Sequence, residues 1–243
     1  MDPLTISAAS GMRARLESLD MLANNLANTA TPGFKLDRES YNLYVAPEAL
    51  SSDAPDPSTL PVVERHWTDF TPGHLATTGG PLDFALGGRG FFAVDGPGGP
   101  LYTRNGNFRL SPAGVLQTGD GYAVRSANGA TIRLQADLPF EVGPDGSVKQ
   151  NGAVAGTLEV ADFANPAALS KFGRTYFQAP EEAGLRPATA VQVYQGKLEG
   201  SNVEGPESTV RLVGILRQFE MLHKAIALSQ DMGRRAIEEV AKV

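Results

Sequence analysis

The chain of 243 residues contains no cysteine. This absence excludes disulfides, thiolate metal ligands and thiol nucleophiles, and it leaves the redox compartment open. Histidine is also scarce, with three residues in the whole sequence. His66, His74 and His223 have no partner at the spacing typical of metal ligands. We therefore expect packed or solvated histidines, and neither a metal nor another cofactor.

Long apolar runs are absent, and none approaches the roughly 20 residues of a membrane span. The N-terminal segment MDPLTISAASGMRARL lacks the basic stretch followed by an apolar stretch that marks a secretory signal. We therefore expect no membrane span and no cleaved signal peptide. The net charge of −6 argues against a nucleic-acid-binding face, which needs a basic surface.

Sequence motifs for catalysis are missing as well. The chain contains no GxSxG, no HExxH and no GxxxxGK[ST], and the glycines of GGRGFF and GDGYAV lie between strand-like runs. The aspartates lie beside glycines or at strand ends, where aspartate commonly serves turns, so a glycosidase-like pair has no support. We therefore expect a protein that is not an enzyme and has no catalytic residues.

Glycine and proline are abundant, with 27 and 17 residues, and they indicate many tight turns. Between residues 65 and 200, short strand-like runs alternate with turn sequences. These turns are Gly96–Gly99, Asn105-Gly106, Gly119-Asp120-Gly121, Asn128-Gly129 and Pro144-Asp145-Gly146. Residues 65–200 are therefore predicted to form a central antiparallel β domain, in which only 165–172 could form a helical turn.

Helical spacing of apolar residues occurs at the two ends of the chain. Within residues 1–35 the predicted seam is Met12, Leu16, Leu19, Ala23 and Leu26. Within residues 201–243 it is Leu212, Ile215, Phe219, Leu222 and Ile226. The seams could be covered by each other or by copies of themselves on other molecules. Residues 36–64, rich in Pro, Ser and Asp, are predicted to form a loop or an extended linker. The predicted fold class is mainly β with terminal amphipathic helices that pair in a coiled-coil-like assembly.

Asn24, Asn25 and Asn28 occupy the end of the first predicted helix, although asparagine is a poor helix former. Two interpretations remain open. Asparagines at a helix–helix contact would penalise wrong registers, which makes all three candidate assembly residues. Alternatively, Asn28 simply caps the C-terminus of the helix.

Three segments resemble the axial proteins of the bacterial flagellum, the rod and hook family. They are LDMLANNLANTATPGFK at 19–35, LGGRGFFAVDGPGGPLYTRNGNFRLSPAGVLQTGDGYAV at 86–124, and VYQGKLEGSNVEGPESTVRLVGILRQFEMLHKAI at 193–226. Within the family, the short length and RQFEM at 217–221 are most similar to proximal-rod subunits, with distal-rod subunits second. Arg211 departs from the family pattern, which usually has Asn at that position.

The resemblance implies a structural subunit of the flagellar basal-body rod. Subunits would stack head to tail, with the terminal helices forming the hollow shaft that transmits motor torque and carries exported subunits. The partners would be further copies, other rod subunits and the flagellar type III export apparatus, with no nucleic acid and no membrane span. The chain would reach the periplasmic rod without a cleaved signal peptide. The alternative is a secreted or surface carbohydrate-binding β module, which would leave the two helical seams unexplained.

Overall fold

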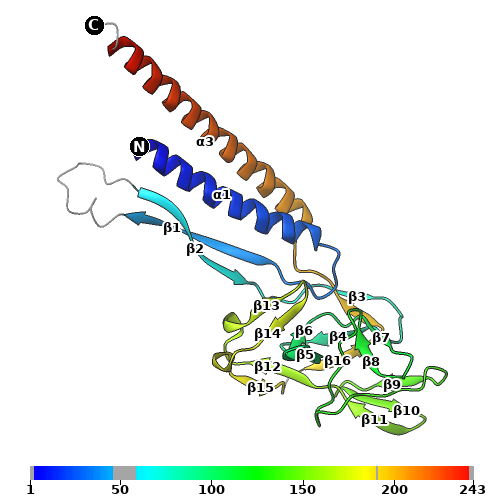
Figure 1. Cartoon of the computed structure of the whole chain (residues 1–243). Helices are drawn as coiled ribbons and strands as arrows, with labels where there is room; N and C mark the ends of the chain where they lie inside the picture. The colour runs from blue at the N-terminus through cyan, green and yellow to red at the C-terminus, as the bar shows by residue number, and fades with distance from the viewer. Residues whose placement is uncertain (1–2, 46–58, 190, 241–243) are drawn as a thin grey trace. The chain divides into compact units, whose positions relative to one another are not determined.

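The computed structural model describes residues 3–45, 59–189 and 191–240. These residues are mainly β structure in antiparallel pairs, with a helix toward each end of the chain (Figure 1). The chain divides into two compact units. The first, called here the helical unit, comprises residues 1–27, 37–69 and 204–243; the second, the β unit, comprises 28–36 and 70–203. The predicted mainly β fold with terminal helices is confirmed.

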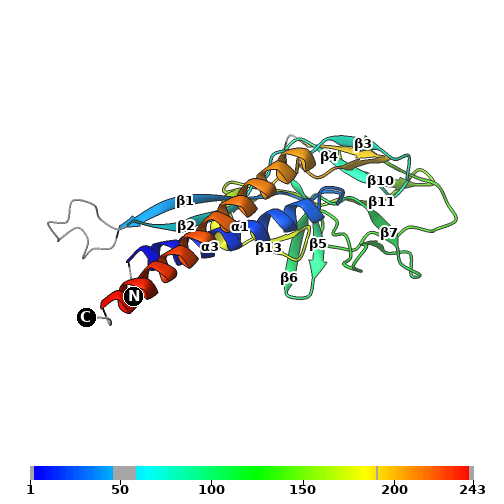
Figure 2. The ribbon, with the colours of Figure 1, turned by 90° about the horizontal axis from the view of Figure 1, so that it is seen from above.

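Two helices make up most of the helical unit. Helix α1 spans Pro3–Ala27 and helix α3 spans Gly205–Val240, and the two lie against each other (Figures 1 and 2). Pro206 and Glu207 lie in the first turn of α3, where a missing N–H and a negative charge are both favourable. Within the described residues, neither helix combines the length and hydrophobicity that crossing a membrane requires.

A two-stranded ribbon completes the helical unit. Strands β1 (Asp37–Val45) and β2 (Thr59–Thr68) are antiparallel, and β1 and β2 both contact α1. The prediction of a loop or extended linker over 36–64 is wrong for these strands, and residues 46–58 lie outside the described residues. The Pro, Ser and Asp content concealed the Tyr and Val residues that favour strands, and pairing supplies backbone hydrogen bonds that neither segment has alone.

The β unit consists of short strands in several antiparallel sheets. Its first strands are β3 (Leu75–Thr77), β4 (Phe84–Gly87), β5 (Phe91–Gly96), β6 (Gly99–Thr103), β7 (Phe108–Leu110), β8 (Leu116–Thr118), β9 (Phe140–Val142) and β10 (Ser147–Gln150). The later ones are β11 (Ala153–Thr157), β12 (Val160–Phe163), β13 (Ser170–Phe172), β14 (Tyr176–Gln178), β15 (Leu185–Pro187), β16 (Gln192–Gln195) and β17 (Lys197–Glu199). A six-stranded sheet has the order β13-β14-β6-β5-β12-β15, and a three-stranded sheet has the order β11-β10-β9. The remaining pairs are β16-β4, β17-β3 and β7-β8.

The predicted turns fall where the chain reverses, with one exception, although Gly119–Gly121 and Asn128-Gly129 lie between isolated antiparallel bridges and not between strands. Gly96 pairs with Gly99 at the β5–β6 hairpin, and Gly143 N–H bonds to Ser147 across the β9–β10 turn. Asn105-Gly106 instead separates β6 from β7, which belong to different sheets. In the segment 165–172, a single 3₁₀ turn at Pro166–Ala168 precedes β13.

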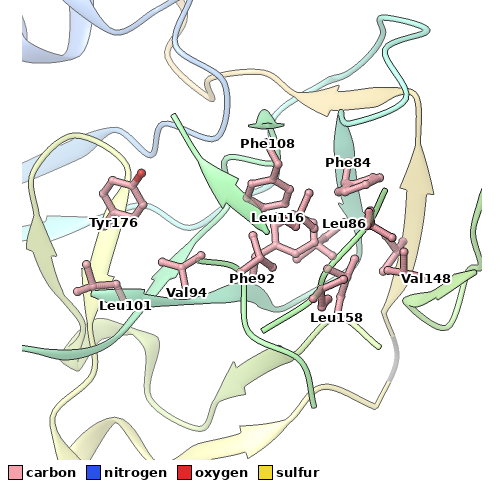
Figure 3. Close-up of a cluster of buried hydrophobic side chains, with 14 residues drawn as sticks. Phe84, Leu86, Phe92, Val94, Leu101, Phe108, Leu116, Val148, Leu158 and Tyr176 are labelled. Carbon is pink, nitrogen blue, oxygen red and sulfur yellow. The ribbon is translucent and has the colours of Figure 1, made fainter. Parts of the chain in front are cut away.

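Strand β5 separates two hydrophobic clusters because successive side chains of a strand point to opposite faces. Phe92 and Val94 belong to the larger cluster, part of which is drawn in Figure 3 together with Phe84 and Leu116. Phe91 packs in the other cluster with the side chains that include Tyr102, Phe163 and Phe177. The β unit therefore has a hydrophobic core that is independent of the helices.

Candidate functional site

The predicted seam of α3 is the covered side of this helix. Ile215 is 6% exposed, and the other four predicted positions are half-buried: Leu212, Phe219, Leu222 and Ile226. Helical spacing of three and four residues keeps these positions on one face. Large apolar residues elsewhere on α3, such as Met221 and Leu228, are each 61% exposed. The structure thus places the five predicted positions on the less exposed side of α3, and their role in assembly stays a prediction.

The predicted seam of α1 is not the stripe that the chain itself buries. Met12, Leu19 and Leu26 are half-buried, while Leu16 is 48% exposed and Ala23 is exposed. The buried stripe consists instead of small and polar residues together with one leucine: Gly11, Ala14, Ser18, Leu22 and Asn25. Apolar periodicity missed this stripe because glycine, serine and asparagine do not count as hydrophobic.

The residues in the buried stripe of α1 can be buried because they are small or because their polar groups are hydrogen-bonded. Gly11 and Ala14 present little side chain, and the hydroxyl of Ser18 donates to the carbonyl of Ala14 at 2.8 Å, so that its polar group is satisfied inside the helix. A spacing of Gly, Ala and Ser at three and four residues is the sequence signal that could have found this face.

The three asparagines around the C-terminus of α1 differ sharply in their environment. Asn25 is buried, its side-chain amide donates to the carbonyl of Asp37 at 2.9 Å, and its side-chain oxygen accepts from the N–H of Asp37 at 3.0 Å. Asn25 thereby joins α1 to the first residue of β1. Asn28 is also buried, and its side-chain oxygen accepts from the Thr31 hydroxyl at 3.0 Å in the loop after the helix. Asn24 is exposed.

We predict that Asn25→Ala destabilises the helical unit by about 1–2 kcal/mol, because it leaves both backbone groups of Asp37 without the Asn25 amide. Asn24→Ala is the matched control, and it should be neutral or stabilising by some tenths of a kcal/mol, since alanine is the better helix former. Thermal unfolding followed by circular dichroism at 222 nm checks both. Equal effects of the two substitutions would contradict the anchoring role of Asn25.

A buried ionic cluster lies where the three resembling segments meet in the β unit. Its members, Lys35, Arg104 and Glu199, come one each from PGFK, YTRNG and LEGSN. Lys35 Nζ lies 2.6 Å from Glu199 Oε1, and the two side chains are 0% and 1% exposed. Arg104 Nη1 lies 3.2 Å from Glu199 Oε2. One carboxylate therefore neutralises part of the charge of two buried cations, and we call this the motif cluster.

Further hydrogen bonds hold each member of the motif cluster. Lys35 Nζ donates to the carbonyl of Thr71 at 2.7 Å, and Arg104 Nη2 donates to the carbonyl of Gly88 at 2.8 Å. The N–H of Gly73 donates to Glu199 Oε1 at 2.9 Å. Burial lowers the pKa of the Arg104 guanidinium below its usual value, and the neighbouring Glu199 opposes that shift.

The loop TPGFK is fixed to the β unit along its backbone as well. The N–H of Gly33 donates to the carbonyl of Glu199 at 2.7 Å, and the N–H of Leu36 donates to the Asn202 side chain at 2.8 Å. Gly33 has φ +68°, and a Cβ there would lie 2.2 Å from the backbone nitrogen of Asn105. Only glycine fits this position, because both the conformation and the space exclude a side chain.

Arg211, the residue at which the sequence departs from the family pattern, has a partner within the helical unit. Its guanidinium lies 3.6 Å from a carboxylate oxygen of Glu39, whose side chain is 0% exposed. This ion pair links the first turns of α3 to strand β1. Within the described residues, no three His, Asp or Glu side chains gather as a metal site.

Three protein families match separate segments of the chain. The family described as flagella basal body rod protein matches residues 7–35, which contain most of α1 and the TPGFK loop. The flagellar hook protein FlgE/F/G D1 domain matches residues 85–154 of the β unit. The family described as flagellar basal body rod FlgEFG protein C-terminal matches residues 194–239, which include β17 and nearly all of α3.

Curated relatives match along nearly the whole chain. The flagellar basal-body rod protein FlgF of Caulobacter vibrioides is 32% identical over 99% of this chain and 98% of its own length. FlgF of Rhizobium meliloti is 34% identical over 95% of both chains. The flagellar basal-body rod protein FlgG of Bacillus subtilis is 30% identical over 93% of this chain and 94% of its own length.

Proposed function

Because the chain belongs to the family of flagellar basal-body rod proteins and is a structural rod subunit, we propose that it polymerises through its terminal helices into the hollow shaft of the rod. The shaft would transmit motor torque and carry exported subunits. The observation that carries this proposal is the helical unit, in which the two ends of the chain form long helices that lie against each other. We propose that this pair is coiled-coil-like, with the ten seam residues and Asn24, Asn25 and Asn28 as its assembly residues.

The motif cluster supports different roles for the two units. It fixes the loop that follows α1 and the segment that precedes α3 to one buried site of the β unit. Such a site suits a subunit that must transmit force between its helices and its β unit, because ionic and hydrogen-bonded contacts resist displacement of both chain segments. We propose that residues 1–35 and 201–243 serve assembly and that 65–200 form the central β domain.

We further propose that the rod is periplasmic and that the flagellar export apparatus delivers the chain without a cleaved signal peptide. A chain without cysteine suits passage through both reducing and oxidising compartments, since it cannot form unwanted disulfides. Proximal-rod identity is the subtype we propose, on the similarity to FlgF proteins at 32% and 34% identity.

The test is to isolate intact basal bodies from the organism and to measure the chain in them by quantitative mass spectrometry. A rod subunit should be present at several copies per basal body and should remain after washes that remove peripheral proteins. Its absence from basal bodies that carry complete rods would overturn the proposed function.

A further inference from the structure

Helix α3 carries a second apolar stripe that the chain does not cover. Val210 is 74% exposed, Met221 and Leu228 are each 61% exposed, and Met232 is 58% exposed. At about 100° per residue these four positions lie within roughly 40° of one another. Gly214 lies in the same arc, which contains no charged residue between Val210 and Met232. We call this face the outer stripe of α3.

The covered stripe of α3, centred on Ile215 and Phe219, is rotated by about 140° from the outer stripe. Helix α1 shows the same arrangement. Its buried stripe of Gly11, Ala14, Ser18, Leu22 and Asn25 is rotated by about 120° from the predicted seam, in which Leu16 and Ala23 are exposed. Each helix thus has one face that the chain covers and a second, apolar face on which some residues are exposed.

A helix with two apolar faces needs two neighbours, and this chain supplies only part of that cover. The 25 residues of α1 span about 38 Å, whereas the 36 residues of α3 span about 54 Å, so α1 cannot follow α3 over its whole length. The exposed apolar residues of α3 run from Val210 to Met232, about 33 Å of helix. Exposure of this extent is typical of an interface between chains.

We propose that the outer stripe of α3 in one copy packs against the predicted seam of α1 in a neighbouring copy. This inference rests on the proposed function and names the surface through which the rod subunits join. A contact between different faces is heterologous, so it propagates into an open assembly. A contact of the outer stripe with itself would close a dimer and leave the seam of α1 exposed.

The two faces are complementary in size, and the charges beside them disfavour a contact of α3 with itself. The outer stripe of α3 presents long side chains: Met221, Leu228 and Met232. The exposed side of α1 presents the small residues Ala23 and Ala27 beside Leu16. The long side chains of α3 can therefore fill the space above the small ones of α1. Exposed cations flank the outer stripe at Arg217 and Lys224. At one edge of the seam of α1, exposed Asp20 lies next to exposed Arg13, so this edge carries charges of both signs. A contact of α3 with itself would instead bring the like charges of Arg217 and Lys224 from both copies together, which disfavours it relative to the α1–α3 contact.

Cysteine cross-linking tests the proposal directly, because the natural chain contains no cysteine. Full-length Leu16→Cys chains with an affinity tag are mixed with untagged Met221→Cys or Leu228→Cys chains under assembly conditions and then oxidised. We expect a tagged–untagged disulfide with whichever of the two positions the register brings opposite Leu16. The matched control is Glu220→Cys, which is also exposed but lies about 100° from the outer stripe. Equal yields from Glu220→Cys, or Met221→Cys chains linking mainly to themselves, would overturn the proposal.

A second measurement separates this inference from the proposed function. Met221→Glu should raise the concentration needed for assembly about tenfold or more, because a charge must then be desolvated in the contact, while Gln218→Glu should leave it unchanged. Circular dichroism of the dilute chain should be the same for both, since both positions are exposed. If Met221→Glu chains enter basal bodies as the natural chain does, the interface is wrong and the rod function stands. If the natural chain is itself missing from basal bodies, the proposed function fails.

Discussion

Replacing Glu199 by glutamine is expected to lower the free energy of unfolding of the β unit by about 3–5 kcal/mol. The substitution leaves Lys35 and Arg104 buried without the carboxylate that lies 2.6 Å from one and 3.2 Å from the other. A buried charge deprived of its partner is among the most costly defects in a protein interior. Urea unfolding of the full chain, followed by the near-ultraviolet dichroism of the buried tyrosines, measures the loss.

The control for this prediction is Asp95→Asn. Asp95 pairs with Arg125 at 3.3 Å, but its side chain is 45% exposed, so its loss should change stability by less than about 1 kcal/mol. A double variant, Lys35→Met with Glu199→Leu, removes one cation and the carboxylate together. It should remain destabilised, because the buried Arg104 still lacks its carboxylate. A Glu199→Gln chain as stable as Asp95→Asn would show that the motif cluster contributes little to the fold.

Phe219→Asp is expected to separate the helices from each other without affecting the β unit. Phe219 lies on the covered stripe of α3, next along that stripe to Ile215, and an aspartate there must be desolvated at a cost of several kcal/mol. Helical dichroism at 222 nm should fall and motility should be lost. The unfolding midpoint of the β unit should be unchanged, because its hydrophobic clusters contain no residue of α3.

Gln218→Asp is the matched control for Phe219→Asp, since Gln218 is the preceding residue and is exposed. It introduces the same carboxylate into the same turn without burying it. We expect normal helicity and normal swimming from this variant. A Phe219→Asp strain that swims as well as the Gln218→Asp strain would contradict the seam as an assembly element.

The sequence predicted best where one local pattern decides the structure. The stripe from Leu212 to Ile226 belongs to a single long helix, and its regular spacing needs no knowledge of the partner. Likewise, Gly96–Gly99 and Pro144-Asp145-Gly146 specify turns through their own backbone preferences, and both turns occur where predicted.

Features that depend on distant partners could not be read in the same way. Lys35 and Glu199 are 164 residues apart in sequence, and charged residues are ordinarily assigned to the surface. The buried stripe of α1 contains Gly11 and Ser18, which no hydrophobic pattern selects. Strands β1 and β2 are stabilised by each other across a long connection, so neither had a clear signal alone.

Deleting the gene for this chain and imaging basal bodies by electron microscopy tests the central claim most directly. We predict non-motile cells whose basal bodies lack a complete rod, and full recovery of both rod and motility when the natural chain is supplied from a plasmid. Motile cells with complete rods in the absence of the chain would contradict its role as a structural subunit of the rod.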